Sequence, residues 1–253
     1  MKRKSTLLLI VIVFALLINA CSFAAAEPTA TPAPTDTAAP TATATNTSTP
    51  TKTPVPTKTP NLAATKQYEE WNAEIQKYYD AGYIGTTDGK IKQLKGFSEE
   101  WAQLNWYYIW PLGETASEFV YSAHYKWEHG SKTPNESGCG LIFSAQDDGD
   151  NYAVILDKTK IIFLHTKGSY GLPVGKSRGT GRVDIENTEA DFTVIVYDYY
   201  TYVLVNGEVV GEYSLSKADP LEGQMGVTIL SGTNKDFGTR CEMTNVRLWK
   251  PNK

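Results

Sequence analysis

The sequence predicts a mainly β domain of short antiparallel strands, a sandwich or a barrel, that follows a helix and a long unfolded segment. Three observations support this fold class. From about residue 105 onward, apolar and polar residues alternate along short runs, which is the period of a half-buried strand. Turn signals separate these runs, with no helical pattern between them. Residues 22–60, in contrast, lack the apolar content that a folded core needs.

The clearest strand is expected at residues 117–128, where every second residue from Phe119 to Trp127 is apolar or aromatic. The dipeptide Asn206-Gly207 is a strong signal for a type I′ turn and predicts a hairpin at that point. Similar short runs predict further strands at residues 139–145, 152–157, 160–166, 192–197, 200–205, 208–213, 225–230 and 240–249.

Ahead of the strands, residues 61–104 are expected to form a helical lead-in. Aromatic and apolar residues, Trp71 and Ile75 among them, recur at helical spacing over residues 61–80. Gly82 suits the C-terminal end of that helix. Ser98, with two glutamates after it, is expected to begin a second, short helical turn, because serine caps helices and acidic residues favour their N-termini.

Residues 1–20 have the three parts of a secretory signal peptide. A basic head precedes an apolar run at residues 7–18, and the small residue Ala20 stands just before Cys21. This arrangement resembles a bacterial lipobox, in which the cysteine carries the lipid. We therefore expect a lipoprotein anchored through Cys21 in the cell membrane and facing its extracytoplasmic side. The alternatives are an ordinary cleaved signal and an uncleaved membrane helix, for which the run is near the lower length limit.

Residues 21–60 are expected to form an unfolded stalk, because they are mostly threonine, proline and alanine and offer almost nothing to bury. The repeated prolines favour an extended chain of about 3.1 Å per residue, which gives a reach on the order of 100 Å. The density of threonine is also typical of O-glycosylated stalks. Such a segment would hold a folded head away from the membrane.

The net charge and the cysteines indicate which binding partners and which covalent links to expect. The formal net charge of the whole chain is −4, which argues against nucleic acid as a partner because nucleic-acid binding needs a clustered basic patch. With Cys21 assigned to the lipid, Cys139 and Cys241 remain as an even pair in an oxidising compartment, and we expect a disulfide between them. The alternative is two separate buried thiols. Neither cysteine has a neighbour at metal-ligand spacing, so no metal site is expected.

Four short segments resemble one superfamily. They are SGCGLIF at residues 137–143, NYAV at 151–154, VLVNG at 203–207 and NVRLW at 245–249. Together they are similar to the concanavalin A-like lectin/glucanase superfamily, and within it to laminin-G-like and 3-keto-disaccharide hydrolase-like domains on bacterial surface proteins. The resemblance covers about residues 119–249 and implies a two-sheet antiparallel jelly-roll β-sandwich, which we place at residues 105–253. These motifs mark the scaffold, and a scaffold alone does not give a function.

Glycoside hydrolysis by the glucanase members is not expected. Those enzymes need paired carboxylates in a Glu-x-Asp-x-Glu motif, one as nucleophile and one as acid. Here Glu189 and Asp191 begin the pattern, but Thr193 stands at the position of the second glutamate. The three histidines share no motif either, so no catalytic residue is assigned, and catalysis is left as the less favoured reading.

Aromatic residues give the best indication of a binding site. Trp106 and Tyr108 belong to an aromatic-rich first strand, while Tyr199 and Tyr200 lie at a turn between strands. Flat aromatic faces can stack on the C–H faces of sugar rings, so we assign these four residues to ligand binding. The alternative for each is packing, since aromatics are favoured in strands and supply much buried area. The glycine-rich residues 168–181 are expected to form a long flexible loop, where recognition is often found.

No cofactor is expected. The acidic run at residues 147–151 offers oxygen ligands of the kind that calcium prefers, but without EF-hand spacing. A hairpin turn is the favoured reading, because tight turns select aspartate, glycine and asparagine.

The predicted function is a membrane-anchored lipoprotein that displays a non-catalytic module for a carbohydrate or another surface ligand. Two alternatives stay open. One is a sugar-acting hydrolase of the 3-keto-disaccharide type, and the other is a structural or protein-interaction module. Expected partners are therefore the membrane, through the lipid anchor, and a glycan or a surface protein.

Overall fold

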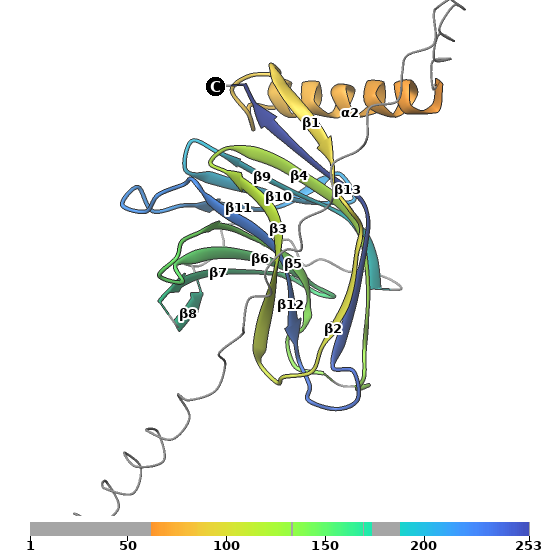
Figure 1. Cartoon of the computed structure of the whole chain (residues 1–253), viewed down its shortest axis with the longest axis vertical. Helices are drawn as coiled ribbons and strands as arrows, with labels where there is room; N and C mark the ends of the chain where they lie inside the picture. The colour runs from red at the N-terminus through yellow and green to blue at the C-terminus, as the bar shows by residue number, and fades with distance from the viewer. Residues whose placement is uncertain (1–61, 133, 169, 174–187, 253) are drawn as a thin grey trace, which may run out of the picture. The chain divides into compact units, whose positions relative to one another are not determined.

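The structure is a computed structural model that describes residues 62–132, 134–168, 170–173 and 188–252. The predicted signal peptide, Cys21 and the predicted stalk lie outside the described residues. Within the described part, two antiparallel sheets face each other across one hydrophobic core, and a single helix precedes them (Figure 1). This confirms the predicted fold class, a mainly β two-sheet sandwich of jelly-roll type.

Each sheet mixes strands that are distant in sequence. The seven-stranded sheet has the order β1 (Gly89–Gln93), β13 (Thr239–Pro251), β4 (Phe119–His129), β9 (Glu189–Tyr197), β10 (Tyr200–Val205) and β11 (Glu208–Ser214), and β2 (Phe97–Trp101) also pairs with β13. The six-stranded sheet has the order β3 (Trp106–Ala116), β12 (Gly223–Ser231), β5 (Gly138–Ala145), β6 (Asn151–Asp157), β7 (Ile161–Lys167) and β8 (Tyr170–Pro173).

Alternation along the strands places the core between the sheets. Tyr121, Tyr125 and Trp127 on β4 are fully buried there, as the period-two pattern predicted. The sheets are also joined covalently, because Cys139 on β5 and Cys241 on β13 form a disulfide with their Cα atoms 6.0 Å apart. The predicted pairing of these two cysteines is therefore present, and both side chains are buried.

The helix α2 (Leu62–Asp80) packs on the outer face of the seven-stranded sheet (Figure 1). Its buried Ile75 belongs to an apolar cluster with Val120, Ile195 and Trp249, which lie on three strands of that sheet. The helix ends as predicted. Gly82 has a positive φ of 76°, and the next N–H, that of Tyr83, donates to the carbonyl of Tyr78 at 2.9 Å, a Schellman termination.

The hairpin predicted at Asn206-Gly207 connects β10 and β11. Both residues have positive φ, 51° and 83°, as a type I′ turn requires. This turn fixes the pairing of the last two strands of the seven-stranded sheet.

Three local predictions are corrected. The helical turn expected at Ser98 is instead strand β2, and the lead-in also contains strand β1, so the sandwich begins at Gly89 rather than at residue 105. Both strands are short and polar, and they form because β13 offers them a partner that is distant in the sequence, with Trp101 paired to Thr239 and Gly89 to Pro251. Within the predicted flexible loop, residues 170–173 form β8, which pairs with β7. Residues 174–181 of that loop lie outside the described residues.

Candidate functional site

A groove of about 1120 Å³ lies along the six-stranded sheet. Strand β3 contributes Trp106 to Ile109, and β7 contributes Ile162, Leu164 and Thr166. The remaining lining residues come from other strands and connections: Asn105, Asn135, Glu136, Gly149, Asn151, Gly168 and Leu230. The groove thus combines an apolar floor with polar side chains toward its ends.

Strand periodicity sets which side chains face the groove. On β6, Tyr152 and Val154 belong to the core between the sheets, so Asn151 points to the opposite, outer face. The same holds on β7, where Phe163 is in the core and its neighbours Ile162 and Leu164 face outward. The floor of the groove is therefore the outer face of the sheet.

Hydrogen bonds organise the polar part of the groove near Asn151. The hydroxyls of Tyr107 and Thr166 lie 2.7 Å apart and are hydrogen-bonded, although these residues come from β3 and β7. Asn151 is the register partner of Thr166, and its Nδ2 donates to the carbonyl of Gly149 at 2.9 Å. Three strands, β3, β6 and β7, and one turn thus hold this end in place.

A second polar group comes from the residues around the start of β3 and β5. Asn135 donates its Nδ2 to Oδ1 of Asn105 at 3.1 Å. The neighbouring Glu136 forms an ion pair with Lys160. These residues are exposed, and they offer amide and carboxylate groups to a ligand in the groove.

Trp106 and Tyr108, two of the four predicted ligand-binding residues, line this groove. Their side chains are 54% and 47% exposed. The ring of Tyr108 also packs against Trp101 and Trp110, with centroid distances of 4.8 and 4.7 Å. Alternation along β3 places the rings of Trp106 and Tyr108 on the same side as Trp110, which packs against the core, so they lie on the core side at the β3 edge and not on the outer face that forms the groove floor. The Nε1–H of Trp101 on β2 donates to the carbonyl of Trp106 at 3.2 Å. The aromatic side chain of β3 on the outer face is that of Tyr107, whose register partner Leu230 also lines the groove.

Tyr199 and Tyr200, the other predicted pair, lie on the seven-stranded sheet at the β9–β10 turn. The structure therefore does not bring them together with Trp106 and Tyr108. Tyr199 has a positive φ of 63° and is partly buried against the main core. Tyr200 is 41% exposed, and its ring stacks at 6.5 Å from that of Tyr202.

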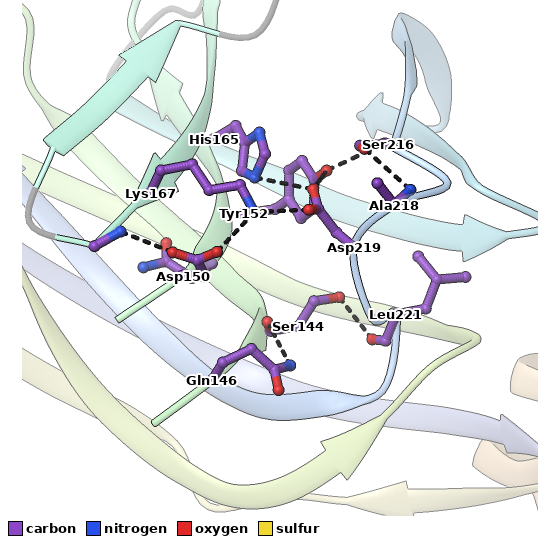
Figure 2. Close-up of polar contacts among 12 residues, drawn as sticks. Ser144, Gln146, Asp150, Tyr152, His165, Lys167, Ser216, Ala218, Asp219 and Leu221 are labelled. Atoms are coloured by element: carbon purple, nitrogen blue, oxygen red, sulfur yellow. Dashed lines mark hydrogen bonds and ion pairs between the residues drawn. The ribbon is translucent and has the colours of Figure 1, made fainter. Parts of the chain in front are cut away.

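Sequence reasoning missed a cluster of charged and aromatic residues at the end of β6 and β7. Figure 2 shows Lys167 between Asp150 and Asp219, with its Nζ 2.6 Å from an oxygen of each. Asp219 also accepts from the hydroxyl of Tyr152 at 2.8 Å and lies 3.1 Å from Nε2 of His165. The Tyr152 and His165 rings stack at 4.3 Å.

The electrostatics of this cluster favour charge pairing over proton transfer. Hydrogen bonds to the two aspartates raise the pKa of Lys167, so it stays protonated. Burial alone would raise the pKa of Asp219, but hydrogen bonds from Lys167 and Tyr152 outweigh it and lower that pKa. Burial raises the pKa of Tyr152 to about 12. The ion pairs and hydrogen bonds of this cluster thus hold β6 and β7 against the β11–β12 connection. We call this cluster the charged brace.

Strand alternation puts Tyr152, His165 and Lys167 on the core side of the sheet, but the cluster had no sequence motif. Its central carboxylate, Asp219, is 67 residues from Tyr152 and 52 from Lys167. Alternation alone does not say which loop closes over the end of a sheet. Only the folded topology brings Asp219 to this place.

The acidic run at residues 147–151 forms the β5–β6 turn, as favoured from the sequence. Oδ1 of Asp148 accepts from the N–H of Asp150 at 3.0 Å, and Gly149 has a positive φ of 93°. The carboxylate of Asp150 is directed to Lys167 and to the N–H of Gly168, and the Lys167 hydrogen bond is the main cause of its lowered pKa. Among the described residues, no group of three or more His, Cys, Asp or Glu is placed to hold a metal ion.

The incomplete glucanase motif lies elsewhere. Asp191 is on β9 of the seven-stranded sheet, where its Oδ1 is 2.9 Å from Nδ1 of His124. It is not among the residues that line the groove. In the described part of the chain, no helix is both long and apolar enough to cross a membrane.

Neither a family model nor a curated protein sequence matches this chain. Several solved structures are similar in fold. The carbohydrate-binding module CBM66 from Bacillus subtilis is 11% identical, over 62% of this chain and 94% of that one, with a TM-score of 0.45. A native glycosidic hydrolase is 10% identical over 66% and 97%, with a TM-score of 0.41. Sheep galectin-11 in complex with glycerol is 11% identical over 58% and 98%, with a TM-score of 0.36.

Proposed function

We propose that this protein is a carbohydrate-binding module, anchored to the cell membrane on its extracytoplasmic side and held out on a stalk. The observation that carries the proposal is the groove on the outer face of the six-stranded sheet. Ligand sites are typically concave and mostly apolar, with a few polar groups that fix orientation. The groove has this character, and its volume is in the range of sites that enclose several sugar rings or a molecule of similar size.

The chemistry of the groove suits a sugar. Apolar side chains such as Ile109, Ile162 and Leu164 offer contact to the C–H faces of the rings. The ring of Tyr107, on the same outer face, offers a flat aromatic surface beside them. Amide and hydroxyl groups at the polar ends can exchange hydrogen bonds with sugar hydroxyls.

We favour binding over cleavage because the usual glycosidase mechanism requires two carboxylates that face one sugar. Among the described residues that line the groove, one carboxylate is present, Glu136, and it is paired with Lys160. The predicted lipid anchor at Cys21 and the stalk at residues 21–60 complete the proposal, with the membrane as one partner and a glycan as the other.

A glycan-array screen of the full chain in mild detergent, with and without calcium, tests the binding function. We expect specific binding that is lost in Tyr107→Ala, whose ring is on the groove face, and kept in Tyr200→Ala, whose side chain is on the other sheet. No binding to any glycan would overturn the proposal and favour a protein-interaction module. Release of shortened sugars during the assay would favour the hydrolase instead.

The membrane anchor has its own test. In cells that express the full chain, mass spectrometry of the membrane-bound protein should show that residues 1–20 are removed and that Cys21 carries a lipid, and Cys21→Ser should lack the lipid. An unmodified chain that keeps residues 1–20 and has no lipid would indicate an uncleaved membrane helix.

A further inference from the structure

One buried polar atom in the groove lacks a partner. Asn151 is 6% exposed, and among the described residues its Oδ1 has no hydrogen-bond partner. The assignment of oxygen and nitrogen is set by the neighbouring bond, because Nδ2 donates to the carbonyl of Gly149 at 2.9 Å. A flipped amide would place two oxygens against each other. Buried acceptors nearly always have a donor, so this one needs an explanation.

The position of Asn151 distinguishes it from the other unpaired atoms. Within the described part, three more buried side-chain atoms lack partners, namely Trp127 Nε1, Thr201 Oγ1 and Tyr213 Oη. None of those residues lines the groove, whereas Asn151 does. Oδ1 itself has less than 1 Å² of exposed surface, so a ligand in the groove reaches it once the Asn151 side chain turns toward the groove, and the ligand group that it then accepts from must be a donor.

The surroundings of Asn151 favour a hydroxyl as that donor. Its register partner Thr166 has a hydroxyl bonded to that of Tyr107, and either of the two can be the donor. A sugar hydroxyl that donates to Asn151 can thus also accept from this pair. Sites that recognise a hydroxyl in this way discriminate strongly against ligands that lack it, because the buried group of the protein is then left unpaired.

The charges in the groove exclude one class of glycan. Acidic sugars are usually held by arginine or lysine through charge-assisted hydrogen bonds. None of the described lining residues is arginine, lysine or histidine, and the one charged side chain among them is the carboxylate of Glu136. Because Glu136 is already paired with Lys160, the described lining offers no free cation to pair with a uronate or a sulfate.

On the basis of the proposed function, we propose that the groove selects uncharged glycans and that Asn151 is its specificity-determining residue. In the bound state, Asn151 Oδ1 accepts a hydrogen bond from one sugar hydroxyl, while the apolar floor contacts the ring. The position left unsatisfied in the free protein is then satisfied by the ligand.

The test compares Asn151→Leu with Thr201→Val in the full chain. Both changes remove a buried polar atom that lacks a partner, but only the first lies in the groove. Against an array of neutral, uronate and sulfated glycans, we expect the unmodified chain to bind a neutral glycan. Asn151→Leu should weaken that binding by about tenfold or more, with a modest fall in melting temperature because the Nδ2 bond to Gly149 is lost as well, and Thr201→Val should bind normally.

The outcomes separate this inference from the proposed function. If the unmodified chain binds a glycan and Asn151→Leu binds it equally well, the role of Asn151 is wrong and the lectin function stands. If the unmodified chain prefers acidic glycans, the proposal that the groove selects uncharged glycans is wrong. If Asn151→Leu does not fold, binding of the unmodified chain to a set of mono-O-methyl derivatives of the sugar tests whether one sugar hydroxyl is required as a donor. One methylation should abolish binding, and tolerance of every methylation would contradict the inference.

Discussion

At the residue scale, the two predicted tyrosines at the β9–β10 turn have different roles. Tyr199 is partly buried against the main core, and Lys217 Nζ lies 5.9 Å from its ring centroid. We expect Tyr199→Ala to lower the free energy of unfolding by about 1–2 kcal/mol through lost burial. Tyr200→Ala, at an exposed position, should change it by less than about 0.5 kcal/mol. Urea unfolding of both variants measures this difference.

The same pair distinguishes two locations for the sugar site. If the groove is the site, both variants should bind glycan as the unmodified chain does. If Tyr200→Ala is stable but loses binding, the turn rather than the groove holds the ligand, and the original assignment of Tyr200 is correct.

The disulfide is the second feature at this scale. Cys139 and Cys241 are 102 residues apart, so the bond restricts a long loop in the unfolded chain. Chain-entropy arguments give a stabilisation of up to about 5 kcal/mol for such a loop, and native bridges typically contribute about 2–5 kcal/mol. The double variant with Cys139→Ala and Cys241→Ala should therefore unfold at a lower denaturant concentration. Reductant should destabilise the unmodified chain and leave the double variant unaffected, while equal stability of the two proteins would contradict the argument.

At the element scale, the helix α2 is expected to be part of the folded domain rather than a separate lead-in. Ile75 is 5% exposed against the outer face of the seven-stranded sheet, and Arg247 lies over the ring of Trp71 at 5.3 Å. Ile75→Ala should destabilise the domain by about 2–4 kcal/mol, as usual for a buried apolar side chain. The exposed Asn72→Ala on the same helix is the control. Two variants of equal stability would mean that the helix is only loosely attached.

The strands show what the sequence could predict and what it could not. Strand β4 was evident because its apolar residues alternate from Phe119 to Trp127, and the Asn206-Gly207 turn has a local conformational requirement. Strand β2 was missed because its residues are mostly exposed and its partner, β13, is distant in sequence. A polar edge strand is specified by backbone pairing, which leaves little trace in the side-chain pattern.

The candidate site, like the strands, could be predicted from the sequence only in part. The aromatic-rich first strand that contains Trp106 and Tyr108 does border the groove, but their rings are on the core side and that of Tyr107 is on the groove side. Asn151 entered the sequence analysis only as the end of the acidic run at residues 147–151, because its unpaired buried oxygen depends on the fold. The brace at Lys167 was equally hidden, since it depends on which loop brings Asp219 to the end of β7.

At the scale of the whole molecule, several groups release protons when the chain folds. Hydrogen bonds from Lys92 and Lys250 lower the pKa of Glu114, a buried carboxylate at the edge of the sandwich. The pKa of Asp219 is also lowered, as described above. Burial lowers the pKa of His129, and the charges of Asp157 and Glu128 oppose this only in part. In each case the folded state binds fewer protons than the unfolded state.

The free energy of unfolding should therefore decrease in two stages as the pH is lowered. A depressed pKa gives stability that is present above the unfolded pKa and lost as the pH falls toward the folded one. The loss should begin below about pH 6.5 through His129 and continue below about pH 4 through the carboxylates.

Urea midpoints at pH 7, 5.5 and 3.5 measure both stages. His129→Gln should remove the first stage only, because the carboxylates are unchanged. Lys167→Met should weaken the second, because Asp150 and Asp219 lose the cation that lowers their pKa values. A midpoint that stays constant from pH 7 to 3.5 would show that these pairs do not contribute to folding.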